Sequence, residues 1–251
     1  MTAIGNVRLS SALPAIIVPV NAPRLRGLVE QTRAASASSD VDIIEWRADA
    51  LLSHASLTRA RDALAAIIAE AGDTPVLVTV RTSAEGGDIT CGPARYLDLC
   101  LNLVRQRPAA IDVEISQPHA DEVIAAAREK GVVAVASRHD FAGTMASAEW
   151  ARELALMREL GADVAKLAVT TATPKAARRF LDTIEDYVAD TQSLPLIAAG
   201  MGNEGPLVRA WAPSAGAQAT FASFDAVTAP GQIDARVLAA LWRACGRRAS
   251  A

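Results

Sequence analysis

The lysine at position 166 lies inside an apolar run. The run reads DVAKLAV over residues 163–169, whereas Lys130 and Lys175, the other two lysines, stand beside a glycine and a proline at ordinary helix-end positions. Burying an ammonium group among aliphatic side chains is costly unless the group is paired or neutralised, and desolvation near other cations lowers the pKa of a lysine. A neutral buried amine attacks carbonyl carbons. Lys166 is therefore a candidate Schiff-base nucleophile.

A structural ion pair is the competing interpretation of the same lysine. Asp112 and Glu114 lie two residues apart in another strand-like run, and either carboxylate could pair with Lys166 inside the protein. The residue types alone leave both interpretations open.

Of the three histidines, His139 has the most informative context. It lies near the end of a Val- and Ala-rich run over residues 132–140, whereas His54 lies in a polar turn and His119 in a loop, both typical of surface residues. Enamine chemistry needs a base that removes one proton and later returns one. His139 is the candidate for that role, and a structural hydrogen-bonding histidine is the alternative.

Polar residues recur in pairs toward the carboxyl ends of the strand-like runs. Residues two apart in a strand share one face, and buried parallel strands are ordinarily apolar, so such pairs require a reason. A single pair could be a strand-end salt bridge, such as Glu45 with Arg47 or Arg81, but agreement among several strands favours a shared polar site. The pairs are Glu45 with Arg47, Thr79 with Arg81, Asp112 with Glu114, and Ser137 with His139.

Eight β-rich runs alternate with amphipathic segments along the chain. The runs cover residues 15–20, 41–49, 75–82, 109–116, 132–140, 163–169, 195–201 and 219–224. The segments between them repeat apolar residues at three- and four-residue spacing, which is typical of helices; examples are 57–71, 95–107, 120–131, 147–161 and 174–190. Strict alternation implies parallel crossovers, and eight units close into a (β/α)₈ barrel, whose active site lies at the carboxyl ends of its strands. An open doubly wound α/β sheet is the alternative fold. No linker or repeat divides the chain, so we expect one catalytic barrel domain over residues 1–251.

Composition argues against several classes of protein. The 251 residues carry 25 basic and 28 acidic side chains, mixed along the chain, with a formal net charge of −3, so nothing indicates binding to nucleic acid or to a membrane surface. No apolar stretch is long enough to span a bilayer. Cys91, Cys100 and Cys245 lack metal-ligand spacing, and the N-terminus lacks a leader-like pattern. We therefore expect a cytoplasmic protein that acts on a small molecule without a metal.

A glycine motif after the seventh run fits the dinucleotide fingerprint. Residues 200–205 read GMGNEG, and Asp225 follows. The motif does not belong to the first βαβ unit, however, and Arg209 suits a substrate anion better. Loops after strands seven and eight of barrels commonly bind anions through backbone N–H groups, which would account for the glycines without a nucleotide.

Together the motifs resemble those of type I 3-dehydroquinate dehydratase, a family of the shikimate pathway. The motifs follow one another in order: EWRAD (45–49), TVRTSAEGG (79–87), DVE (112–114), SRHDF (137–141), ADVAKLAV (162–169), GMGNEG (200–205) followed by Arg209, and TAPGQ (228–232). The resemblance implies a homodimeric (β/α)₈ lyase without cofactor or metal. Such an enzyme converts 3-dehydroquinate to 3-dehydroshikimate and water, in aromatic amino acid biosynthesis or alternatively in quinate breakdown.

The resemblance also implies roles for individual residues. Lys166 would form the Schiff base, His139 would be the general acid and base, and Glu85 would orient His139. Arg209 would bind the substrate carboxylate in bidentate fashion. The substrate-binding set would comprise Glu45, Arg47, Arg81, Arg209, Thr228 and Gln232.

Four positions depart from the family pattern, and two other functions stay open. Thr228 stands where serine is usual, Val208 and Ala217 replace expected serines, and Met145 replaces an expected proline. A class I barrel aldolase would also use Lys166, although several arginines around a carboxylate fit its phosphorylated substrates less well. A non-catalytic barrel that binds a small anion is the alternative that the departures favour.

Overall fold

The computed structural model, which describes residues 2–225 and 231–248, closes eight parallel strands into a barrel. Neighbours in the ring follow chain order, and the last strand pairs in parallel with both the first and the seventh. The strands are β3 (Ala15–Val20), β4 (Ile43–Arg47), β5 (Val76–Thr79), β6 (Ala110–Glu114), β7 (Val133–Asp140), β8 (Val164–Thr170), β9 (Leu196–Met201) and β10 (Ala219–Phe221). The predicted (β/α)₈ barrel is confirmed, and each of the eight runs contains one barrel strand.

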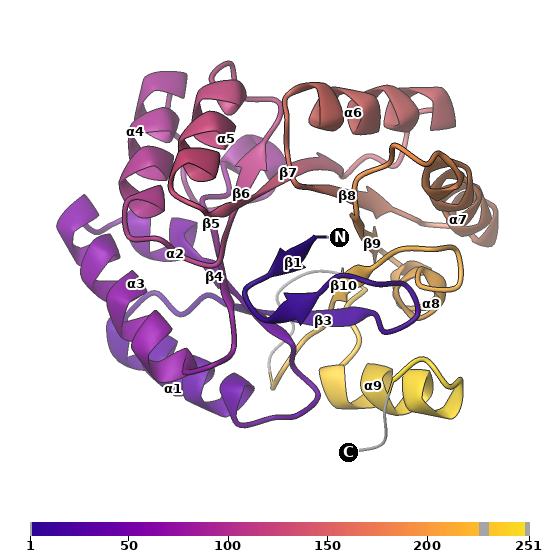
Figure 1. Cartoon of the computed structure of the whole chain (residues 1–251), viewed down its shortest axis with the longest axis horizontal. Helices are drawn as coiled ribbons and strands as arrows, with labels where there is room; N and C mark the ends of the chain where they lie inside the picture. The colour runs from indigo at the N-terminus through magenta and orange to yellow at the C-terminus, as the bar shows by residue number, and fades with distance from the viewer. Residues whose placement is uncertain (1, 226–230, 249–251) are drawn as a thin grey trace.

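Helices form an outer layer around the ring of strands (Figure 1). They are α1 (Leu25–Ser36), α2 (Ala48–Leu52), α3 (Leu57–Ala71), α4 (Pro93–Val104), α5 (Ala120–Glu129), α6 (Ser147–Glu159), α7 (Pro174–Ala189), α8 (Gly205–Trp211) and α9 (Ala235–Ala244), with a 3₁₀ turn η1 (Ser83–Glu85). Side-chain N-caps define where α3, α7 and α9 begin: Ser56, Thr173 and Asp234 each accept a hydrogen bond from a backbone N–H of the first turn. Over the described ranges, no helix combines the length and apolar character needed to cross a membrane.

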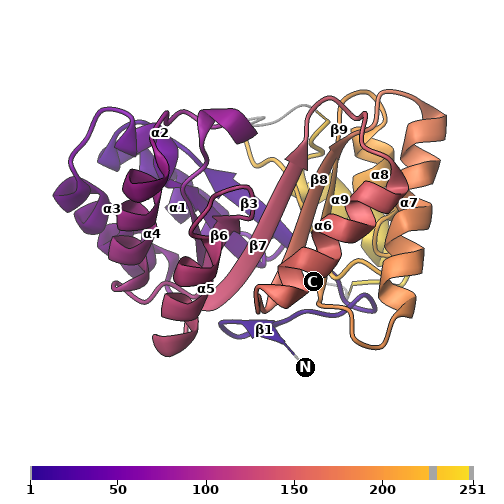
Figure 2. The ribbon, with the colours of Figure 1, turned by 90° about the horizontal axis from the view of Figure 1, so that it is seen from above.

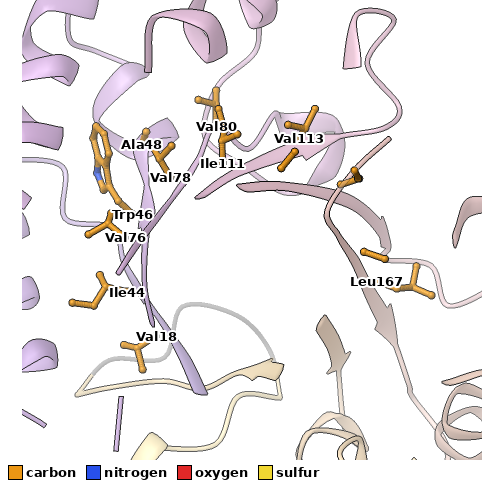
Figure 3. Packing of buried hydrophobic residues seen from close by; sticks show 14 of the residues in the cluster. Val18, Ile44, Trp46, Ala48, Val76, Val78, Val80, Ile111, Val113 and Leu167 are labelled. Carbon is orange, nitrogen blue, oxygen red and sulfur yellow. The ribbon is translucent and has the colours of Figure 1, made fainter. Parts of the chain in front are cut away.

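Alternation along each strand divides the apolar side chains between two cores. Outward-facing residues such as Ile44, Trp46 and Leu167 join the large core between strands and helices (Figure 3). Inward-facing residues such as Ile43 and Val164 belong to a second cluster inside the barrel. Because the period of a strand is two, Lys166 shares the inward face with Val164.

A short hairpin closes the amino end of the barrel. Strands β1 (Ala3–Ile4) and β2 (Val7–Arg8) pair antiparallel, and Ile4 and Leu9 are buried with the interior cluster; Figure 2 shows β1 below the barrel strands. The first β-rich run that the sequence predicts begins at residue 15, because two-residue strands have no readable periodicity. With this end sealed by apolar side chains, the polar inward-facing residues lie at the opposite end.

Candidate active site

A pocket of about 670 Å³, counting the space open to solvent, lies at the carboxyl ends of the strands. Barrel enzymes build their sites at this end because strand ends and loops from separate units converge there. The pocket brings together most of the candidate residues: its lining is Pro19, Glu45, Arg47, Arg81, Glu85, Gly86, His139, Phe141, Lys166, Ala168, Ala199, Met201, Arg209, Phe221 and Gln232. Thr228, the remaining candidate, lies outside the described residues.

Lys166 extends from the middle of β8 into the base of this pocket. Its side chain is 5% exposed, and Nζ lies 2.7 Å from Asp112 Oδ2 and 3.4 Å from Glu45 Oε1. Nζ also lies 4.4 Å from the ring centroid of Phe221, a cation–π distance. Glu45 is fixed in turn by Thr79, whose hydroxyl donates to Oε1 at 2.8 Å. The lysine therefore pairs with Asp112, as the structural interpretation expects, and also faces the pocket, as a nucleophile must.

Arg81 organises the carboxylates behind the lysine. Its guanidinium donates to Asp112 Oδ1 at 2.5 Å and to Glu114 Oε1 at 3.1 Å, and the Ser137 hydroxyl donates to Asp112 Oδ1 at 2.6 Å. Burial by itself would raise the pKa of Asp112, but Arg81 and Lys166 hold that pKa well below its usual range. Asp112 is therefore a carboxylate that stays ionised.

Arg47 points to the pocket from the end of β4. Its Nε and Nη2 donate to Asp49 at 2.9 and 2.8 Å, a bidentate contact with a completely buried carboxylate. The salt bridge weighed in the sequence analysis, Glu45 with Arg47 or Arg81, does not form among the described residues. Asp49 holds Arg47 instead, and this pairing explains the acidic residue at the end of the EWRAD motif.

His139 stands at the other wall, held by Glu85. Its Nδ1 lies 2.9 Å from Glu85 Oε2, and its ring stacks on Phe141 with centroids 5.8 Å apart. Burial, together with the positive charges of Arg81 and Lys166, lowers the pKa of His139 well below its usual range. The ring is therefore neutral at pH 7. Because a carboxylate can only accept, we assign the hydrogen to Nδ1, which leaves Nε2 as an acceptor.

Arg209 lies deep on the β10 side of the pocket and is 1% exposed. Nε donates to the Gly231 carbonyl at 3.0 Å and Nη1 to the Phe221 carbonyl at 2.8 Å, so the guanidinium plane is fixed. Burial lowers its pKa to about 10, so the group is still charged at neutral pH. No carboxylate within the described ranges forms an ion pair with it. A buried cation without a counter-ion, on the wall of a pocket, suits an anionic ligand.

The glycine motif serves close packing. A Cβ on Gly205 would lie 2.9 Å from the Gly200 carbonyl oxygen and 3.1 Å from Gly231 Cα, and a Cβ on Gly200 would lie 2.5 Å from Val208 Cβ. The end of β9, the start of α8 and the loop at Gly231 therefore approach as only glycines allow. Packing accounts for Gly200 and Gly205, and Gly202 adopts a left-handed backbone conformation with φ of 76°.

The departures from the family pattern also have packing roles. Val208 and Ala217 are fully buried, and Met145 is half-buried against the same outer core. None of these three side chains lines the pocket. The non-catalytic interpretation therefore loses the observation that favoured it.

Apolar pocket walls are the part that sequence reasoning missed. Phe221, Met201 and Pro19 line the pocket from the ends of β10, β9 and β3. Their strands are predicted, but an apolar residue in an apolar strand carries no chemical signal. Only the inward alternation of each strand could have selected them.

The arrangement supports a defined chemistry. A buried amine beside the ionised carboxylate of Asp112 can condense with a carbonyl group, a neutral imidazole with an open Nε2 can move a proton, and a buried arginine can hold an anion.

Comparisons with known proteins point to one family. The family model of type I 3-dehydroquinase matches residues 16–248. The 3-dehydroquinate dehydratase of Listeria monocytogenes serotype 4a is 31% identical over 240 residues, 94% of each chain, and that of Enterococcus faecalis is 29% identical over 238 residues, again 94% of each. A crystal structure of type I 3-dehydroquinate dehydratase from Clostridium difficile, with covalently modified comenic acid, has a TM-score of 0.92 at 26% identity and 98% coverage of both chains.

Proposed function

The chain belongs to the type I 3-dehydroquinase family, and from this premise we propose that it dehydrates 3-dehydroquinate to 3-dehydroshikimate through a Schiff base on Lys166. The reaction is a lyase step of the shikimate pathway. One observation carries the proposal: the amine of Lys166, the imidazole of His139 and the guanidinium of Arg209 line a single pocket. The curated relatives named above are dehydratases, which favours this reaction over an aldol cleavage.

The proposed steps use these side chains in turn. Lys166 Nζ gives up one proton and attacks the ring ketone, and that proton leaves with the carbinolamine oxygen as water. The product is an iminium that draws electrons from the neighbouring carbon. His139 Nε2 removes a proton from that carbon and then protonates the departing hydroxyl, so one base both accepts and donates. Water hydrolyses the iminium, which releases the enone product and regenerates the amine.

The other candidates position the reactants. Glu85 keeps His139 in the tautomer with a free Nε2, and Arg209 binds the substrate carboxylate. Glu45, Arg47, Arg81 and Gln232 hold the ring hydroxyls and the carboxylate from the remaining walls. We assign Thr228 to the same set from the family resemblance alone.

The homodimer rests on the family resemblance, and the single domain and the cytoplasmic setting rest on the sequence pattern and the cysteines. Residues 1–251 form one catalytic domain, two copies form a homodimer, and the enzyme works in the cytoplasm. Sedimentation velocity and cell fractionation test the last two statements; a monomer, or a membrane-bound enzyme, would contradict them.

The direct test is to mix the protein with 3-dehydroquinate and to follow the ultraviolet absorbance of the conjugated enone. We expect a steady rise that EDTA does not reduce, because every proposed step uses side chains of the chain itself. Heat-denatured protein is the control. A flat trace would count against the proposed reaction, and loss of the signal in EDTA would count against the metal-free mechanism.

Substitution of Arg209 by alanine is expected to raise KM about 100-fold while kcat changes much less, because loss of one partner of a buried charge pair weakens binding by about 2–5 kcal/mol. Steady-state kinetics check this. Arg209→Lys is the matched control, since it keeps the charge but loses the fork geometry, and it should recover only part of the binding. A fall in kcat at unchanged KM would contradict the role of Arg209 in binding.

A further inference from the structure

The Glu85 carboxylate is held on both of its edges. Oε2 faces the pocket side, 2.9 Å from His139 Nδ1 and 3.5 Å from Arg81 Nη1. Oε1 accepts hydrogen bonds from Ser116 Oγ at 2.5 Å and from Arg138 Nη1 at 3.1 Å. The side chain of Glu85 is 3% exposed, so these partners take the place of water.

Arg138 reaches this carboxylate from the opposite face of β7. It precedes His139 in the strand, so its side chain leaves on the outer side, where its Nε also lies 3.8 Å from Glu153 of α6. The Arg138 side chain is 30% exposed and that of Glu153 is 25% exposed. A single carboxylate therefore bridges a cation behind the barrel wall and an imidazole in front of it.

Two effects follow from this bridge. The bonds to Oε1 fix the rotation of the carboxylate, so Oε2 meets Nδ1 in one geometry. The positive charge of Arg138 also offsets the negative charge that would otherwise stabilise a protonated imidazole. Other charged groups around the Glu85–His139 pair are Arg47 on β4, Arg81 after β5, Asp112 and Glu114 on β6, Lys166 on β8 and Glu153 on α6.

We propose that Arg138 and Ser116 are positioning residues of the proton-transfer step, acting on His139 through Glu85. They hold the Glu85 carboxylate in place. Arg138 also keeps the imidazole neutral, and so able to accept a proton, down to a lower pH than it would reach without this arginine. This inference rests on the proposed function, in which His139 is the base.

Arg138→Met is the central variant, because it removes the charge and keeps an unbranched apolar side chain. We expect kcat about tenfold lower at unchanged KM, as for a catalytic group that is less well oriented. We also expect a change in the pH profile of kcat/KM. Its decline at low pH, the acid limb, should move about half a pH unit toward neutrality. Arg138→Lys keeps the charge and should return the limb to its wild-type position. Arg152→Met removes a 74% exposed arginine from neighbouring α6 and is the matched control that should change neither quantity.

A substrate-free measurement separates this inference from the proposed function. The imidazole of His139 can be titrated by NMR, with His54 and His119 as internal references, and its midpoint should rise in Arg138→Met by the same half unit. If the wild-type protein does not dehydrate 3-dehydroquinate, the proposed function fails, and the titration still decides whether Arg138 acts on the His139 imidazole through Glu85. A wild-type midpoint in Arg138→Met overturns it.

Ser116→Ala covers the case in which Arg138→Met does not fold, as judged by circular dichroism. This variant changes no charge and should lower kcat several-fold while the acid limb moves little. A kcat equal to that of the wild type in Ser116→Ala would then overturn the positioning role.

Discussion

Replacement of Lys166 by alanine is expected to lower kcat by at least about 10⁴-fold, the scale of loss when a covalent nucleophile is removed. The reason is chemical: without Nζ no iminium forms, and the ring carbon that must lose a proton is no longer acidic. Substrate binding should survive, because Arg209 and the other polar walls remain. Isothermal titration with the substrate, beside the enone assay, separates the two effects.

Lys166→Arg distinguishes this chemistry from a structural ion pair. Arginine keeps a positive charge beside Asp112 but does not form a Schiff base at neutral pH. If the lysine served only as the 2.7 Å partner of Asp112, the arginine variant would retain activity. We expect it to be as inactive as the alanine variant while keeping more of the wild-type thermal stability, measured by differential scanning calorimetry.

Borohydride gives the covalent test. Reduction in the presence of 3-dehydroquinate should leave a permanent mass increment on the peptide that contains residues 162–169. Lys130 and Lys175 are exposed, so they act as internal controls, and Lys175→Ala should leave the adduct and the activity unchanged. An adduct that never forms, or that maps to either exposed lysine, would rule out Lys166 as the nucleophile.

The barrel was predictable from sequence because its signals are long and repeated. Each run such as 15–20 or 195–201 is apolar on both faces, and each intervening segment has helical spacing, so strands β3 and β9 were found almost to the residue. The β1–β2 hairpin was not predicted, because its stability comes from burying Ile4 and Leu9 under the finished barrel. A contact made only after the strands close leaves no local pattern.

The sequence predicted which strand face carries each candidate side chain, but it did not predict which of these side chains pair with one another. Period-two alternation placed Lys166 and Asp112 on inward faces, but the sequence left Asp112 and Glu114 as equal partners for the lysine. Side-chain contacts in the folded barrel decide between them: Arg81 and Thr82 donate to the Glu114 carboxylate, whereas Asp112 Oδ2 lies 2.7 Å from Lys166 Nζ. Arg138 behind Glu85 was missed altogether, since a residue that faces outward from a strand gives no sign that its long side chain returns to the site.

His139→Ala is the second variant with a large expected effect. Removal of a general acid and base lowers turnover by about 10²–10⁴-fold, and we expect kcat to fall in that range. The Lys166 adduct should still form with borohydride, because attack on the ketone precedes the step that needs the imidazole. This combination, slow turnover with an intact adduct, separates a proton-transfer role from general damage to the site.

The pH profile gives the same residue a second, independent signature. His139 must be neutral to accept a proton, and burial with neighbouring cations lowers its pKa well below the usual value near 6.5. The sign follows directly: wild-type kcat/KM should hold steady as the pH falls through 6.5 and decline only at lower pH, where the imidazole becomes protonated. The residual rate of His139→Ala should lack that limb. An undiminished enone signal in His139→Ala, or an acid limb that persists in that variant, would assign the proton transfer to another group.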